Sequence, residues 1–274
     1  MEYDTLILSG GSVKGIAFLG FFKYLLENDI INFKTLKHII AASAGAFMSL
    51  VLLFNIKIEI AYKIMIDTEV NIIEKAKFKL ENFINEFGFF DNNIVEKYTK
   101  LLCKYFINRE NITLKELYRL NKIKFTVKVS NVTNGCIEYI NYKNYPDMDI
   151  VTLIKMTTSI PLLFKPVMYN NCLYSDGANG GGLPIEYNKS KKYLAVILHP
   201  LKTPEIKKKH NIFDYLNNLF SIHTKINDYN KYIKYKNIIV IDLDIPIKID
   251  TNYKEKIKLF TGGYFITKDF FSKF

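Results

Sequence analysis

The chain has 274 residues, 49% of them hydrophobic, and a formal net charge of +11 at pH 7. This length and apolar content predict one folded globular domain and exclude a disordered or fibrous chain. Lysine supplies almost all of the positive charge, because Arg109 and Arg119 are the only arginines. A basic surface favours contact with anionic membranes or nucleic acid. The scarcity of arginine argues against readout of base edges, so we expect no nucleic-acid partner.

Cys103, Cys136 and Cys172 are widely spaced and odd in number, which fits neither a disulfide framework nor a zinc site. We therefore expect a reducing, cytoplasmic compartment. The acidic start of the chain leads directly into a strand and predicts no signal peptide. Residues 39–56 are uncharged and just long enough to span a membrane, but the serines and glycine within them favour a buried strand and helix. No metal-ligand pattern is evident, so we expect no metal or cofactor.

The first predicted elements are a buried strand over residues 4–8, a glycine-rich loop over 10–15 and a helix over about 13–28. Glycines in such a loop leave backbone N–H groups exposed to a ligand. The loop could hold a phosphate, but its glycine spacing fits neither the G-x-G-x-x-G pattern nor a P-loop.

A second buried strand over 37–42 and a helix over 44–55 flank Ser43. The neighbours of this serine are very small, namely Ala41, Ala44 and Gly45. This pattern predicts a nucleophile elbow, a sharp strand-to-helix turn that presents the serine. Strand and helix pass so closely there that larger side chains would collide. The alternative is that Ser43 is an ordinary helix N-cap.

Residues 57–122 form a long predicted helical stretch, which we interpret as a cap or lid inserted into a single domain of residues 1–274. An apolar stripe at helical spacing runs along it, formed by Ile72, Ile73, Ala76, Leu80, Phe83, Ile84 and Phe87. Lysines lie on other faces, at Lys75, Lys77 and Lys79. The stripe either packs on the core or, in a lid, meets lipid while the lysines meet headgroups.

A β-hairpin is predicted next, from two segments of alternating polarity over 125–132 and 136–142. The intervening residues 133–135, Thr-Asn-Gly, favour a tight reversal of the chain. A helix over 150–159 follows and is ended by Pro161.

Asp176 follows two short predicted strands, over 166–169 and 172–175, and stands in a tight turn with Gly177 and Ala178. The remaining predicted elements are strands over 193–198 and 237–243 and helices over 211–231 and 253–273. Strands that alternate with helices in this way predict an α/β fold with a mainly parallel sheet.

Three motifs stand in order along the chain: Gly10-Gly11-Ser12-Val13-Lys14-Gly15, Ala41-Ala42-Ser43-Ala44-Gly45 and Asp176-Gly177-Ala178. Together they resemble the patatin-like phospholipase family, whose pattern is Gly-Gly-Gly-x-Arg/Lys-Gly, Gly-x-Ser-x-Gly and Asp-Gly-Gly/Ala. The run Thr-Thr-Ser-Ile-Pro-Leu-Leu-Phe-Lys-Pro over 157–166 is similar to the family's Ser-x-Ser-Ile-Pro-x-x-Phe-x-Pro run. Gly263 and Tyr264 are similar to its terminal-helix signature.

The resemblance implies a three-layer α/β/α patatin-like fold and a serine lipid acyl hydrolase of phospholipase A or lysophospholipase type. It implies a catalytic dyad in which Ser43 attacks the ester and Asp176 accepts the serine proton, through an acyl-enzyme intermediate. The oxyanion hole is expected at the amides of Gly10, Gly11, Ser12 and Ala44. The residues expected to support the motifs are Lys14, Gly15, Ala41, Gly45, Gly177 and Ala178.

The sequence departs from the family pattern at three positions. Ala41 replaces the first elbow glycine, Ser12 replaces the third loop glycine, and Gly182 stands where the family often has asparagine. A methyl group is small and Ser12 still has an N–H group, so we expect activity to survive. A catalytically impaired lipid-binding protein and an acyltransferase are the alternatives.

Two other functions fit parts of the sequence. An α/β-hydrolase triad needs a histidine after the acid, and the candidates are His199, His210 and His223, of which His199 ends a predicted strand. A nucleic-acid binder could use the clusters Lys189, Lys191, Lys192, Lys207, Lys208 and Lys209, although such clusters are usually solvated faces. We expect the dyad, with a phospholipid or another acyl-ester lipid as substrate and peripheral contact with an anionic membrane surface.

Overall fold

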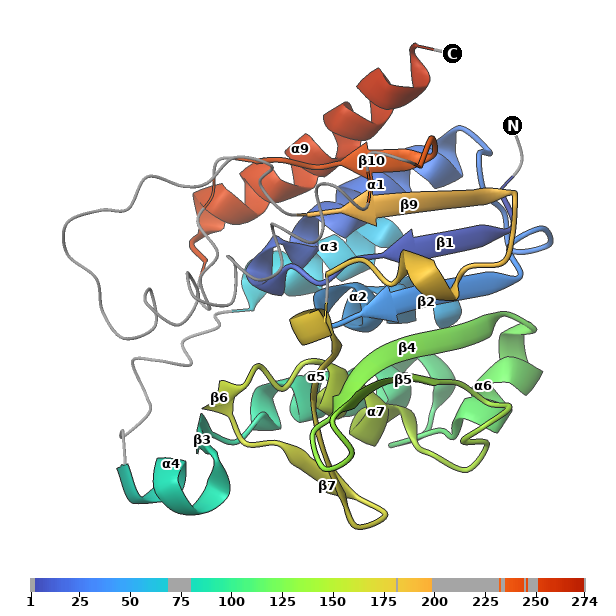
Figure 1. Ribbon diagram of the computed structural model, residues 1–274. Helices are drawn as coiled ribbons and strands as arrows, with labels where there is room; N and C mark the ends of the chain where they lie inside the picture. The colour runs from blue at the N-terminus through green and yellow to red at the C-terminus, as the bar shows by residue number, and fades with distance from the viewer. Residues whose placement is uncertain are drawn as a thin grey trace.

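The main sheet of the computed structural model consists of β1 (Thr5–Leu8), β2 (His38–Ala42), β4 (Lys124–Asn131), β5 (Cys136–Ile140), β7 (Val167–Tyr169), β8 (Cys172–Asp176), β9 (Tyr193–Ile197) and β10 (Ile238–Val240). The structure describes residues 3–68, 80–180, 182–198, 232, 235–243, 245 and 251–273. The strand order is β10-β9-β1-β2-β4-β8-β7, and β5 also pairs with β4 (Figure 1). The strands from β10 to β4 are parallel, whereas β5, β7 and β8 join by antiparallel pairing.

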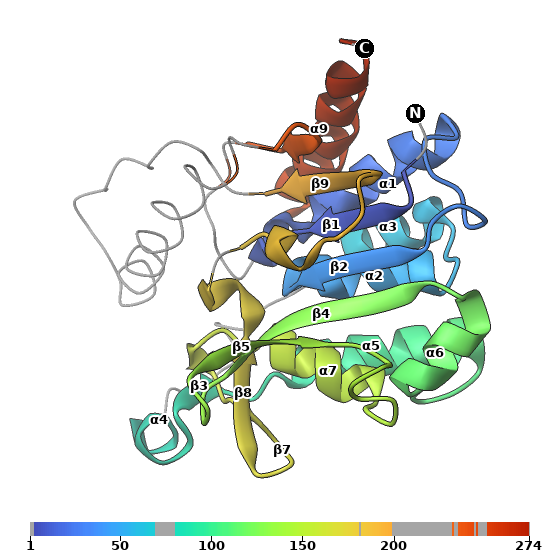
Figure 2. The ribbon, with the colours of Figure 1, turned by 45° about the vertical axis from the view of Figure 1, so that its right-hand side comes forward.

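The α-helices are α1 (Ala17–Glu27), α2 (Ala44–Leu53), α3 (Ile58–Asp67), α4 (Leu80–Glu86), α5 (Asn93–Ile107), α6 (Leu114–Asn121), α7 (Ile150–Thr157) and α9 (Tyr253–Phe271). The described residues also contain the short 3-10 helices η1 (Ser12–Ile16), η2 (Gly177–Gly180) and η3 (Ile185–Tyr187). In Figures 1 and 2, α1, α2, α3 and α9 lie along one face of β10, β9, β1 and β2, and α5, α6 and α7 continue this layer behind β4.

Side chains of the two central strands alternate between two buried clusters. Leu6 and Ile39 belong to a large cluster with the helices of the layer just described. Ile7 and Ile40 point the other way, into a smaller cluster that includes Ile185 of η3. Burial on both faces explains why these strands are almost continuously apolar in sequence. The predicted α/β class with a mainly parallel sheet is confirmed.

The predicted hairpin turns are also present. Gly135 has a φ of 63° between β4 and β5, and Asn170 and Asn171 have φ values of 47° and 59° between β7 and β8. Positive φ at turn positions is accessible to glycine and is tolerated best by asparagine among the other residues. Local turn chemistry therefore places both hairpins where the sequence predicts them.

The prediction that residues 57–122 are helical throughout is wrong at one point. A strand, β3 (Gly88–Phe90), follows α4 and pairs in parallel with β6 (Leu162–Phe164), which was not predicted either. A Cβ atom at Gly88 would lie 2.4 Å from the backbone nitrogen of Lys165, so glycine allows the close approach of these strands. Residues 69–79, which hold part of the predicted stripe, and the predicted helix over 211–231 lie outside the described residues.

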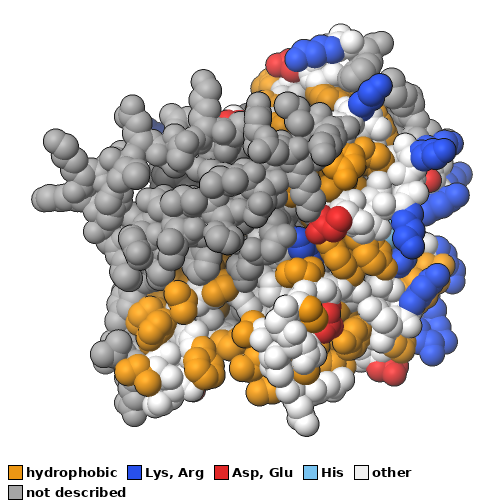
Figure 3. Space-filling model, in the orientation of Figure 1, with side chains coloured by type: hydrophobic (Ala, Val, Ile, Leu, Met, Phe, Trp, Pro, Cys, Tyr) orange, Lys and Arg blue, Asp and Glu red, His pale blue; other side chains and the backbone are white. Residues whose placement is uncertain are grey.

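Figure 3 shows where charged and apolar side chains lie on one face of the molecule. Lysine and arginine gather along the edge at which β1, β2 and β4 begin, and apolar side chains are exposed in several places, including the lower part of the view near β3 and β7. Within the described part of the chain, no helix has the length and apolarity of a membrane span.

Helices α1 and α9 pack in direct backbone contact through glycines. A Cβ atom at Gly20 would lie 1.9 Å from the carbonyl oxygen of Phe260, and one at Gly263 would lie 2.0 Å from that of Ala17. Neither oxygen can move without distorting its helix. The terminal-helix glycine of the sequence therefore fixes the distance between α9 and α1.

We expect Gly263→Ala to lower the free energy of unfolding by about 2 kcal/mol, because overpacking outweighs the higher helix propensity of alanine, about 1 kcal/mol. The matched control is Gly262→Ala, whose added Cβ would meet only the flexible end of Leu243, at 2.6 Å. Urea unfolding of both variants measures the difference. A Gly263→Ala protein as stable as Gly262→Ala would contradict the backbone-contact account.

Candidate active site

Ser43 stands at the sharp turn between β2 and α2. Its backbone has φ 49° and ψ −124°, a conformation that a non-glycine residue adopts only at a cost of roughly 1–3 kcal/mol. Although Ser43 occupies the N-cap position of α2, its side chain makes no capping hydrogen bond. The strand-to-helix elbow that the sequence predicts is therefore present, and the ordinary N-cap interpretation does not describe it.

Small residues around the elbow allow three segments to meet. A Cβ atom at Gly45 would lie 2.5 Å from the carbonyl oxygen of Ser9, so only glycine fits between α2 and the end of β1. A Cβ atom at Gly10 would lie 3.3 Å from the Cβ of Ser43 and 3.0 Å from that of Ala178. The glycine loop, the elbow and the Asp-Gly-Ala turn thus lie in contact.

The sheet itself brings Ser43 and Asp176 together. β2 pairs with β4 up to the Ala42–Lys128 pair, and β8 pairs with β4 through Asp176 and Val129, the next residue. Because β5 occupies the other edge of β4 over these residues, β2 and β8 share one edge. The Oγ atom of Ser43 donates a hydrogen bond to Oδ2 of Asp176 at 2.6 Å.

Asp176 is held in a buried, hydrogen-bonded position. Its side chain is among the buried polar groups, and Oδ1 accepts the backbone N–H of Ala178 at 2.7 Å. Burial raises the pKa of Asp176 to about 6, while the hydrogen bonds from Ser43 and Ala178 and the charge of Lys128 act in the opposite direction. A carboxylate with this proton affinity can accept a proton at neutral pH.

Thr157, at the end of α7, positions the elbow, a role that its place in the 157–166 run does not indicate. Its Oγ1 accepts the backbone N–H of Ser43 at 2.9 Å and donates to the carbonyl oxygen of Lys128 at 2.7 Å. Sequence distance conceals these contacts, since the hydroxyl links residues from three separate elements.

The glycine loop supplies fewer candidate oxyanion donors than the sequence predicts. The N–H of Gly10 donates to the carbonyl oxygen of Gly182 at 3.0 Å, so Gly10 is removed from the expected set. Neither the Gly11 nor the Ala44 amide donates a hydrogen bond to another of the described residues. Ser12 has a φ of 50°, which costs about 1 kcal/mol and explains why the family prefers glycine there.

The side chain of Lys14 anchors the glycine loop to a distant part of the chain. Its side chain is buried, and Nζ donates to the carbonyl oxygen of Leu243 at 3.3 Å. This contact connects η1 to the segment that precedes α9. Gly15 packs closely against α2, because a Cβ atom there would lie 3.0 Å from the Cβ of Ala44.

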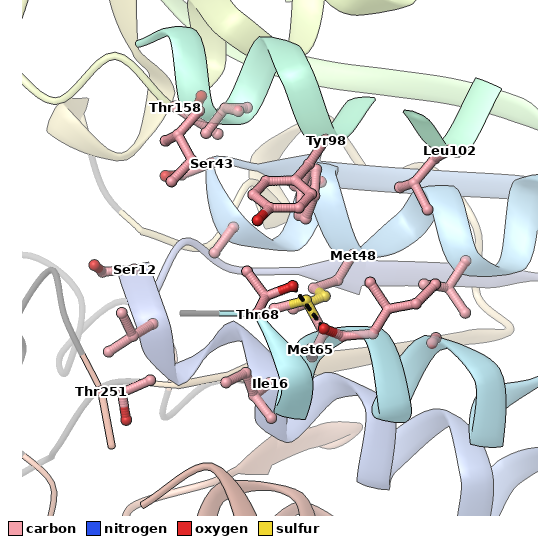
Figure 4. Close-up of a pocket in the computed structure, with 18 of the residues that line it drawn as sticks. Ser12, Ile16, Ser43, Met48, Met65, Thr68, Tyr98, Leu102, Thr158 and Thr251 are labelled. Atoms are coloured by element: carbon pink, nitrogen blue, oxygen red, sulfur yellow. Dashed lines mark hydrogen bonds between the residues drawn. The ribbon is translucent and has the colours of Figure 1, made fainter. Parts of the chain in front are cut away.

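An apolar cavity of about 200 Å³ opens beside Ser43. Its walls come from η1, α2, α3 and α5, and Figure 4 shows Ser43 and Thr158 next to each other at its edge. The side chains that surround the interior include Ile16, Phe47, Met48, Met65, Tyr98 and Leu102. A cavity of this kind suits a hydrocarbon chain better than a polar ligand.

No group of three His, Cys, Asp or Glu side chains that could hold a metal is found among the described residues.

His38 begins β2, at the other end of the strand from Ser43, and its Nε2 forms a hydrogen bond with Oγ1 of Thr126 at 2.8 Å. Burial lowers the pKa of His38 to about 4. The triad candidates His199, His210 and His223 lie outside the described residues, as do Lys207, Lys208 and Lys209.

A family model described as patatin-like phospholipase matches residues 6–188. A protein of Invertebrate iridescent virus 6, "Probable lipid hydrolase 463L", is 25% identical over 266 residues, which cover 95% of this chain and 86% of the relative. VipD from Legionella pneumophila has a TM-score of 0.65 at 16% identity and covers 100% of this chain and 67% of its own.

ExoU from Pseudomonas aeruginosa, solved in complex with SpcU, has a TM-score of 0.55 at 14% identity. The match covers 99% of this chain and 52% of ExoU, so the chain spans about half of that protein. These structural likenesses concern the fold, and they confirm the predicted three-layer α/β/α patatin-like architecture.

We expect Asp176→Asn to stabilise the fold at pH 8 by about 1–3 kcal/mol. Because burial raises the pKa of Asp176 to about 6, ionisation above that pH opposes folding in the wild type, and the asparagine avoids it. The gain shrinks as the pH falls from 6 toward 4, because the folded carboxyl becomes protonated while the unfolded one, with a pKa of 3.8, is still partly ionised. Thermal unfolding at several pH values measures this difference.

The control for that experiment is Asp269→Asn, an exposed aspartate of α9 whose replacement should change stability by less than about 0.5 kcal/mol. The Asp176→Asn variant could instead be less stable than wild type at pH 8, or equally stabilised at pH 4 and pH 8. Either result would show that ionisation of the buried Asp176 carboxyl does not destabilise the fold.

Proposed function

The chain belongs to the patatin-like phospholipase family, and on this premise we propose that it is a serine lipid acyl hydrolase whose catalytic dyad is Ser43 and Asp176. Family membership makes the chain a lipid hydrolase. The finer assignment, to a phospholipase A or lysophospholipase type, is our proposal. The observation that carries the proposed dyad is the 2.6 Å hydrogen bond between the side chains of Ser43 and Asp176, at a strained elbow beside an apolar cavity.

In the proposed acylation step, ionised Asp176 accepts the proton of Ser43 while Oγ attacks the ester carbonyl carbon. Negative charge develops on the carbonyl oxygen, and the proposed donors to it are the amides of Gly11, Ser12 and Ala44. Loss of one such donor typically raises the barrier by about 3 kcal/mol. Collapse of the intermediate expels the alcohol, which takes the proton from Asp176.

In the proposed deacylation step, water is the nucleophile and Ser43 is the leaving group. Asp176, ionised again, accepts a proton from a water molecule that attacks the acyl-enzyme, and the serine leaves with that proton. The cavity holds the acyl chain during both steps, because each square ångström of apolar surface removed from water contributes about 25 cal/mol.

We further propose that residues 57–122 serve as the cap of a single domain covering 1–274. Support comes from α3 and α5, which supply Ala61, Met65, Val95, Tyr98 and Leu102 to the cavity wall. We expect peripheral contact with an anionic membrane, because the net charge of +11 attracts such surfaces over long range. A cytoplasmic location and the absence of a nucleic-acid partner remain predictions of the sequence.

The test compares hydrolysis of a short-chain nitrophenyl ester and of phospholipid vesicles by wild type, Ser43→Ala and Asp176→Asn. We expect both variants to lose at least about a thousandfold in turnover, because each removes one half of the proposed dyad. The matched control is Ser49→Ala in α2, whose Oγ only donates to the carbonyl oxygen of Gly45. Circular dichroism establishes that each protein is folded.

Substantial turnover by Ser43→Ala would refute the nucleophile assignment. Loss in Ser43→Ala but not in Asp176→Asn would indicate a different base, such as a histidine triad. A folded wild type that binds lipid without turning over any acyl ester would favour the impaired lipid-binding alternative.

A further inference from the structure

The apolar cavity beside Ser43 extends along two helices that begin near this residue. Helix α2 begins at the residue after Ser43. Helix α5 begins near the same point, because Asn92, the residue before it, donates from Nδ2 to Oγ1 of Thr158 at 2.8 Å. Figure 4 shows Thr158 next to Ser43. Both helices therefore lead away from the proposed nucleophile.

One face of each helix lines the cavity. The lining positions include Ala44, Met48 and Val51 of α2 and Val95, Tyr98 and Leu102 of α5. Residues three, four and seven positions apart share one face of a helix, so each set forms a stripe along the helix axis. In Figure 4, Leu102 lies on the opposite side of the view from Ser43, and Tyr98 lies between them. The cavity therefore extends from the dyad to the level of Val51 and Leu102.

Large side chains fill the space beyond this far end. The next positions of the two stripes are Phe54 after Val51 and Phe106 after Leu102. Phe54 is part of the main hydrophobic cluster and Phe106 packs against it, and neither ring belongs to the cavity wall. Val51 itself is 5% exposed. An acyl chain that enters beside Ser43 therefore meets filled space beyond Val51 and Leu102.

The length of the cavity sets how many carbons it can hold. From Ala44 to Val51, and from Val95 to Leu102, the chain advances seven residues. This advance is about 10 Å, because the rise of an α-helix is about 1.5 Å per residue. An extended hydrocarbon chain advances about 1.3 Å per carbon, because bonds of about 1.5 Å between tetrahedral carbons form a zigzag. The cavity is therefore long enough for about eight carbons.

The volume of the cavity leads to the same number. This volume is about 200 Å³. A protein cavity of about 150 Å³ accepts benzene, a ring of six carbons. In proportion, the cavity beside Ser43 accepts about eight carbons. Length and volume therefore agree on an acyl group of medium length.

We propose that the cavity selects acyl groups of about eight carbons, and that Leu102 sets this length as the larger of the two side chains at the far end. The proposal rests on the function proposed above and names the substrate class of that site, esters of medium-chain acids. Each methylene group that enters the cavity raises kcat/KM roughly fourfold, the order for one methylene removed from water. Carbons beyond that length find no space, so longer chains lose this gain.

The test measures kcat/KM on a series of nitrophenyl esters whose acyl chains have about four to about sixteen carbons. The wild type should show an optimum at about eight carbons. Leu102→Ala should move the optimum to about eleven carbons, because alanine has three fewer carbon atoms than leucine and leaves that space empty. Leu102→Phe should move it to a shorter chain, because the ring occupies more of the cavity.

The matched control is Leu101→Ala. Leu101 is the neighbouring leucine of α5 and is half-buried like Leu102. It lies with Lys97 and Lys104 on a different face of the helix, outside the cavity wall. Its truncation removes the same atoms, so the optimum should stay at about eight carbons. Circular dichroism establishes that each variant is folded.

Calorimetric titration with saturated fatty acids of the same chain lengths repeats the comparison without turnover. Should the wild type hydrolyse none of the esters, the proposed function fails, and the fatty-acid affinities still decide the role of Leu102. If Leu102→Ala does not fold, Leu102→Phe alone decides it.

An optimum at about eight carbons that Leu102→Ala lengthens, or that Leu102→Phe shortens, supports the proposal. Three results overturn it. The wild-type optimum lies at about twelve carbons or beyond, neither Leu102 variant moves the optimum, or Leu101→Ala moves it as far as Leu102→Ala does.

Discussion

The contact between Ser43 and Asp176 depends on β4. Along one edge of this strand, β2 pairs with the first part and β8 with the part that follows. β2 ends at Ala42 beside Lys128, and the antiparallel β8 ends at Asp176 beside Val129, so two strand ends deliver Ser43 and Asp176 to one point without a long loop. The small residues serve this constraint. Gly45 lets α2 pass the end of β1, and Gly177 lets the chain leave Asp176 against the backbone of β4.

The site contains several residues whose backbone conformation or burial is unfavourable in free energy, and the rest of the fold must compensate for them. Ser12 and Ser43 hold positive φ values, Asp176 is a buried carboxyl, and Lys128 is a buried ammonium. Each of these is unfavourable alone. They persist because fully buried strands and the α1–α9 glycine contact hold the surrounding backbone in place. The strained backbone of Ser43 presents its side chain to the cavity, and burial raises the pKa of Asp176.

Local chemistry made much of this fold predictable. The elbow, the glycine loop and the turns at Gly135 and Asn170 are each specified within a few residues, and the structure has them. Contacts between distant residues were not predictable. The β3–β6 pairing, the Gly10–Gly182 hydrogen bond and the Lys128–Glu186 ion pair join segments whose proximity arises only after folding. The error in the oxyanion loop has this origin, since the motif supplies the amides but not their acceptors.

The most direct measurement of the central claim is covalent trapping with a serine-reactive fluorophosphonate, followed by intact-mass and peptide analysis. The serine oxygen would bond to phosphorus with loss of fluoride, as it would bond to an ester carbon. The account predicts one adduct, located on Ser43, absent from Ser43→Ala and slower to form in Asp176→Asn. A folded wild type that forms no adduct, or forms it on another residue, would contradict the assignment of Ser43 as a nucleophile activated by Asp176.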